Sequence, residues 1–110
     1  MREYPKPVMK LIRQYARQAH EEELRRALES LAQKFVEWQA GSVSSGELTE
    51  VIHGFQSGPS RDLFKLYNDP APLDLAVAHA ITTGVLDEKE IDKAVLSHLE
   101  PAVRMYREKE

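Results

Sequence analysis

Two amphipathic patterns follow one another between Lys6 and Trp38, and neither glycine nor proline stands where they meet. At about 100° per residue, four basic residues of the first half lie on one narrow stripe, with apolar residues behind it. This basic stripe consists of Lys6, Lys10, Arg13 and Arg17. In the second half, apolar residues recur at spacings of four, three, four and three, on the angle that the basic stripe holds in the first half. This apolar seam consists of Leu24, Leu28, Leu31, Phe35 and Trp38.

The apolar side therefore shifts by roughly half a turn along this region, and a straight helix cannot bury both sides against one neighbour. Either the chain breaks or bends sharply between Ala19 and Glu22, or one rod is covered from opposite sides. For a single rod, the expected second cover is another chain. We favour the break, because Arg17 would end one helix and Glu21 would begin the next, as their dipoles prefer.

The middle of the chain carries signals for two short helices. Ser44 and Glu47 have the spacing of a capping box, which predicts a third helix that ends near Ser57. The sequence Gly58-Pro59-Ser60 predicts a turn, after which Ser60 caps a fourth helix. A helix-turn-helix motif across this turn is a weaker alternative, since Pro59 occupies a position that is usually apolar in such motifs.

The last third of the chain predicts two more helices. Residues from Leu73 to Thr83 are apolar nearly all round, which is typical of a buried central helix, and Gly84 would end it. A final helix is expected to begin between Asp87 and Glu90. Pro101 should kink it or start a new segment.

These elements predict an all-α fold, a compact bundle of five to six helices in one domain of 1–110. A long N-terminal helical region, about 6–40 and broken or bent near 19–22, would pack against shorter C-terminal helices. Of the 110 residues 42% are apolar and none is cysteine, so we expect an ordered domain without disulfides. Neither a signal peptide nor a membrane span is expected, and a cytoplasmic location follows.

The net charge of −3 is distributed unevenly. Up to Ala40 there are eight basic and six acidic residues, a net of +2; the remainder has seven against twelve, a net of −5. The basic residues near the N-terminus could bind an anionic partner, a nucleic acid, or the acidic C-terminal part of another copy. A solvated helix face is the simpler interpretation.

One cluster of polar residues suggests chemistry, where the third predicted helix meets the fourth. Glu50 and His53 could form a general-base pair, and Arg61 beside exposed helix amides could bind a carboxylate or phosphate. Asp62 completes this candidate ligand or partner site. Glu-x-x-His also suits di-metal sites, but these need two such pairs and only one exists, so no metal and no cofactor is expected. Capping and turn roles explain most of these residues equally well, and no catalytic residues are assigned.

Three functions remain open. The leading hypothesis is a protein with no catalytic signature that binds another protein or its own copy through the apolar seam. The alternative is a nucleic-acid-binding regulator that uses the basic stripe, which predicts an affinity that falls steeply with salt. A small hydrolase or ligand sensor centred on Glu50, His53 and Arg61 is the weakest of the three.

Overall fold

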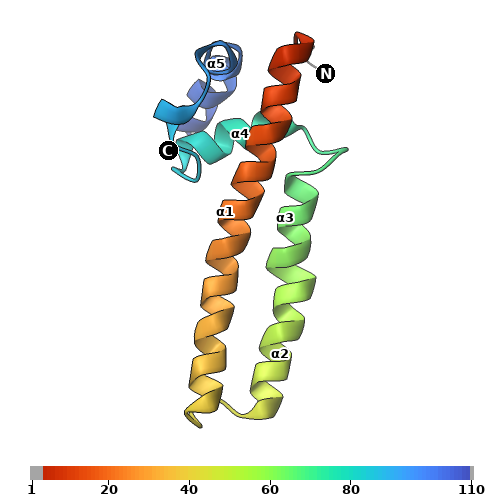
Figure 1. The fold of residues 1–110 in the computed structure, drawn as a ribbon, viewed down its shortest axis with the longest axis vertical. Coiled ribbons are helices and arrows are strands. Elements are labelled where there is room, and N and C mark those ends of the chain that lie inside the picture. The colour runs from red at the N-terminus through yellow and green to blue at the C-terminus, as the bar shows by residue number, and fades with distance from the viewer. Residues whose placement is uncertain (1–3, 110) are drawn as a thin grey trace.

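One helix, α1 (Lys6–Gln39), runs the length of the molecule (Figure 1). A computed structural model describes residues 4–109, and no strand occurs among them. After α1 the chain turns back through α2 (Ser45–Phe55), a π-helical turn η1 (Gln56–Ser60) and α3 (Arg61–Leu66). It then forms α4 (Leu73–Thr82), the 3₁₀ turn η2 (Glu88–Glu90) and α5 (Lys93–Glu108). The all-α class is thus confirmed.

The predicted break near 19–22 is wrong, because α1 is continuous for 34 residues. Alanine and glutamate occupy three of the four positions of this stretch and are good helix formers, and a dipole-compatible charge pattern does not by itself interrupt a helix. In the first half the buried residues are Val8, Ile12, Ala16 and Ala19, which face α4 and α5. In the second half the covered side, at Ala27 and Leu31, lies roughly 80° further round the helix and faces the α2 to α3 segment. The same chain, rather than another, therefore supplies the second cover.

The predicted turn at Gly58-Pro59-Ser60 is also wrong. Phe55, Gln56, Ser60 and Arg61 all have right-handed helical backbone angles, so α2, η1 and α3 form one continuous rod antiparallel to α1. Ser60 makes no capping hydrogen bond with its side chain. A π turn widens the helix by one residue, which gives Pro59 room where an α turn would bring its ring against the carbonyl four residues earlier.

The helices α4 and α5 bury most of the apolar surface, together with the first half of α1. The prediction of a buried central helix is confirmed, since six of the ten residues of α4 are buried. Gly84 ends it with φ at +79°, a conformation that suits glycine. The last helix starts later than predicted, at Lys93, because Asp92 caps it by accepting hydrogen bonds from the amides of residues 94 and 95. It continues through Pro101 without a break.

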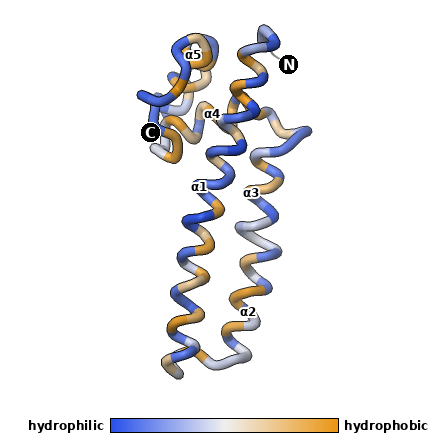
Figure 2. Tube along the Cα trace, in the orientation of Figure 1, coloured by the Kyte–Doolittle hydropathy of each residue, from blue (hydrophilic) through white to orange (hydrophobic). Residues whose placement is uncertain are grey.

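The molecule is elongated rather than compact. Its extents are 53 × 25 × 24 Å and its radius of gyration is 17.1 Å, whereas a compact domain of this size has about 13 Å. Residues 4–109 form four helical segments, α1, the α2–η1–α3 rod, α4 and α5, instead of five or six packed helices. We call residues 4–20 and 67–109 the head and residues 21–66 the arm. The arm is a two-helix hairpin that projects from the head (Figures 1 and 2). No helix in the described part of the chain is both long and apolar enough to cross a bilayer.

Candidate interaction surfaces

The arm has almost no buried core. Within residues 21–66 only Leu48 is buried, at 6% exposure, although apolar residues recur along both helices (Figure 2). Six large apolar side chains of the arm are exposed, and Phe64 is the most accessible at 60%. The six are Leu28, Phe35, Val36, Trp38, Phe64 and Leu66. A two-helix hairpin can cover only one side of each helix, so the other apolar sides stay in contact with solvent.

In the structure, some residues of the predicted apolar seam are partly covered and others are exposed. Leu24 and Leu31 are half-buried, whereas Leu28 and Phe35 remain 45% and 40% exposed. By helical geometry Leu28, the exposed Ala32 and Phe35 fall within about 60° of one another, on the side of α1 away from Ala27. We call these three residues the outer stripe. Ala32 flanks the predicted apolar seam in the sequence, and in the structure it lies on the exposed side of that seam.

Trp38, the last residue of the predicted seam, holds the tip of the arm together. Its indole Nε1 donates a hydrogen bond of 3.0 Å to Ser45 Oγ, which joins the end of α1 to the start of α2. Between the two helices, Gly41 adopts φ of +86° and thereby allows the chain to reverse direction. Trp38 is still 39% exposed, so the contact with Ser45 leaves part of the ring accessible.

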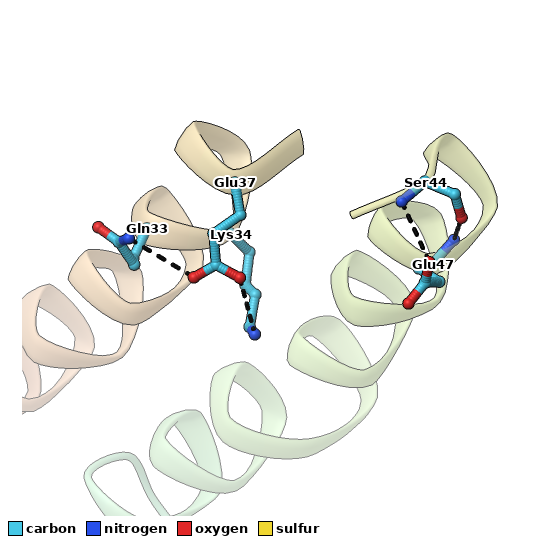
Figure 3. Close-up of polar contacts among 5 residues, drawn as sticks. All are labelled: Gln33, Lys34, Glu37, Ser44 and Glu47. Carbon is cyan, nitrogen blue, oxygen red and sulfur yellow. Dashed lines mark hydrogen bonds and ion pairs between the residues drawn. The ribbon is translucent and has the colours of Figure 1, made fainter. Parts of the chain in front are cut away.

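The predicted capping box at the start of α2 is confirmed (Figure 3). The Glu47 amide donates to Ser44 Oγ, and the Ser44 amide donates to Glu47 Oε1, each at 3.1 Å. The hydrogen bond from the Ser44 backbone, followed by that from its side chain, lowers the pKa of Glu47, because both interactions favour the carboxylate form. Across the tip, Glu37 accepts hydrogen bonds from Lys34 and Gln33 of the preceding turn.

On the other side of the hairpin, α1 and the rod enclose a shallow apolar groove. Small residues at Ala27, Ser30 and Gly54 leave space there, and the walls are almost entirely apolar. We call it the arm groove; it is lined by Ala27, Ser30, Leu31, Lys34, Val51, Gly54, Phe55 and Pro59. The outer stripe and the groove-lining residues of α1 therefore lie on different sides of this helix, roughly 120° apart on average.

The arm joins the head at Tyr67. This side chain is buried at 3% exposure, its hydroxyl donates a hydrogen bond to Glu23 Oε2, and its ring stacks on His20 with centroids 5.8 Å apart. Burial raises the pKa of Tyr67, and the hydrogen bond to the Glu23 carboxylate raises it further. His20 lies within α1 and packs on this ring.

The basic stripe is displayed at the far end of the molecule from the tip. All four of its residues are exposed, and they line one hollow together with Tyr4 and Met9. The ion pairs found among residues 4–109 join other side chains, so the stripe's charges are not neutralised within the described chain. A second, more apolar hollow adjoins it, and it shares Tyr4, Met9 and Arg13 with the first.

The polar cluster around His53 lies on the solvent side of the rod. Glu50, His53, Arg61 and Asp62 are all exposed. The continuous helix removes the exposed amides that were expected beside Arg61, because no helix begins freely there. No group of three or more His, Asp or Glu suited to hold a metal ion occurs in residues 4–109. Ligand binding at these residues stays a prediction.

The chain matches no family model, no curated protein and no solved structure.

Proposed function

We propose that this protein is a protein-interaction module whose binding surface is the arm. The observation that carries this proposal is the distribution of burial: 46 residues of the arm contain a single buried side chain, while six large apolar side chains face solvent. Exposed apolar surface of this kind is a common mark of protein contact sites. Docking a partner helix would bury the outer stripe or fill the arm groove, and either contact would stabilise the hairpin.

The arrangement of the arm supports binding rather than catalysis. The head holds nearly all of the buried core, so it can fold around α4 while the arm extends from it. Aromatic residues are enriched in the centres of protein interfaces, and Phe35, Trp38 and Phe64 offer three such anchors. We also propose a cytoplasmic location, which rests on the cysteine-free composition.

The test is capture of partners from the native cell by the wild-type protein and by a variant that carries Leu28→Glu and Phe35→Glu. Because both side chains are already 40% or more exposed, the variant should keep its helical content and melt within a few degrees of the wild type. A double variant on the opposite side, Arg26→Glu with Gln33→Glu, is the matched control. We expect proteins, including the bait itself, that bind the wild type and the control but not the first variant. Equal capture by all three would refute a role for the outer stripe.

A second candidate function is nucleic-acid binding through the basic stripe. It is favoured by one observation, the convergence of four exposed basic side chains on a single hollow. Binding should weaken steeply with salt, since each phosphate contact releases counterions. Mobility shifts with duplex DNA and RNA at low salt should disappear in a variant carrying Lys10→Glu and Arg13→Glu but persist after Lys65→Glu on the arm. Absence of any shift for the wild type removes this candidate.

A further inference from the structure

We propose that the partner of the arm is a second copy of this chain, and that two α1 helices pair antiparallel through the outer stripe about a two-fold axis at Ala32. This inference rests on the proposed function and specifies its partner. It follows from the symmetry of the stripe, from the charges beside it and from the position of the head along α1.

The outer stripe reads almost identically in both directions. From Arg25 the exposed positions on this side of α1 follow at spacings of three, four, three and four, namely Arg25, Leu28, Ala32, Phe35 and Gln39. When a second copy runs antiparallel with Ala32 opposite its own counterpart, Leu28 of each copy lies within one residue, about 1.5 Å along the axis, of Phe35 of the other. Apolar side chains then meet apolar side chains throughout. A closed dimer needs such a self-complementary patch, whereas an unrelated partner would not require the symmetry.

The charges near the stripe favour the antiparallel arrangement over the parallel one. In a parallel pair Arg25 would face Arg25 and Glu29 would face Glu29, and like charges in contact are unfavourable. In the antiparallel pair Arg25 faces the neutral Gln39. The two Arg25 residues are then about 21 Å apart along the axis, at a rise of 1.5 Å per residue, which exceeds the roughly 8 Å Debye length of physiological buffers.

The position of the head allows this pairing without collision. The tip of the arm lies about 12 Å from Ala32 along α1, whereas the head begins about 18 Å from it on the other side, at 1.5 Å per residue. The tip of each arm therefore ends before it reaches the head of the other copy. A parallel dimer would instead bring the two heads to the same level beside the paired helices.

Ala32 at the axis lets the two helices approach closely, within the usual interaxial distance of 8–10 Å. The exposed parts of Leu28 and Phe35 are the centre of the contact, and Arg25, Val36 and Gln39 form its rim. This patch is smaller than the roughly 800 Å² that each partner buries in a standard interface. We therefore expect a dimer that dissociates on dilution through the micromolar range.

The natural absence of cysteine permits a direct test of the register. Ala32→Cys should form a disulfide-linked dimer under mild oxidation, because the two Cβ atoms meet at the axis. Gln33→Cys, one residue further round the helix, is the matched control and should stay monomeric. An equal mixture of Arg25→Cys and Gln39→Cys proteins should give mainly the mixed disulfide. Predominant Arg25→Cys homodimers would overturn the antiparallel register, and crosslinking of Ala32→Cys no faster than that of Gln33→Cys would overturn the dimer.

Sedimentation of the purified protein separates this inference from the proposed function. At tens of micromolar the wild type should sediment with twice the monomer mass, and Leu28→Glu with Phe35→Glu should sediment as a monomer. A wild type that stays monomeric, together with loss of captured proteins in the same variant, would refute the second copy while leaving the interaction module intact. A monomeric wild type whose captured proteins do not depend on the outer stripe would refute both.

Discussion

At the scale of single residues, a few polar contacts hold the arm in place, since buried apolar contacts are scarce there. Trp38 bonds to Ser45 at the tip, Ser44 and Glu47 cap the returning helix, and Tyr67 bonds to Glu23 where the arm joins the head. The contacts of Trp38 and Tyr67 each join two segments, and the capping box holds the first turn of α2. Their removal should therefore affect the arm more than the head.

Ser44→Ala should lower the free energy of unfolding by about 1 kcal/mol, the usual cost of losing an N-cap. It should also change the dependence on pH. The folded-state pKa of Glu47 is depressed, so its contribution is present above the pKa of an unfolded glutamate and is lost as pH falls through the folded value. Urea denaturation of the wild type and the variant from pH 7 to pH 3 should therefore show the difference shrinking at the acidic end. Ser42→Ala, in the same turn, is the control; an equal loss there would contradict a capping role.

At the scale of elements, local signals in the sequence predicted the capping box at Ser44 and the terminator at Gly84, but not the continuous helix through Ser60 or the cap at Asp92. The capping box at Ser44 and the left-handed Gly84 depend on neighbouring residues alone, so both were predictable. The continuity of α1 was not predictable from neighbouring residues. Its apolar side shifts because the head and the rod contact the helix from different directions. Pro59 and Gly58 look like a turn in sequence, yet a π turn accommodates both within a helix.

Of the candidate surfaces, the seam was predicted in outline. The sequence could not show that α2 and α3 cover Leu24 and Leu31 and leave Leu28 and Phe35 outside, since that depends on which side of α1 the rod approaches. The arm groove was not predicted at all. It arises from small residues on two helices that are distant in sequence, such as Ala27 and Gly54.

Two glycine substitutions test the backbone of these elements in opposite directions. Gly54 lies inside α2 with nothing within 4 Å of an added Cβ, so Gly54→Ala should stabilise the protein by about 0.5–1 kcal/mol. Gly84 has φ of +79°, so Gly84→Ala should destabilise it by about 1 kcal/mol or more even though the space is open. Chemical denaturation measures both changes. A destabilising Gly54→Ala would mean that the backbone at this position of α2 is not helical.

At the scale of the whole molecule, the buried core lies at one end and most of the large exposed apolar side chains lie at the other. The head contains the buried cluster around Val77, Val95 and Leu99. The arm exposes apolar side chains and contributes little core of its own. Isolated helices and hairpins with few buried contacts are marginal in water, so the arm depends on the head at one end. The proposed partner would add contacts along its length.

This division predicts two tiers of hydrogen exchange. Amides in α4 and α5 should exchange only through global unfolding, because these helices carry most of the core, whereas amides of 24–37 and 46–65 should exchange through a local opening of lower free energy.

The free energy of this local opening should also depend on protein concentration. If two copies pair through the outer stripe, protection of 24–37 should increase from low to high micromolar protein, since association stabilises only the closed arm. Native-state exchange followed by mass spectrometry at two protein concentrations measures both effects, and Leu28→Glu with Phe35→Glu should abolish the second while preserving the first. Uniform protection of head and arm in the monomeric variant would show that the arm folds cooperatively with the head despite its sparse core.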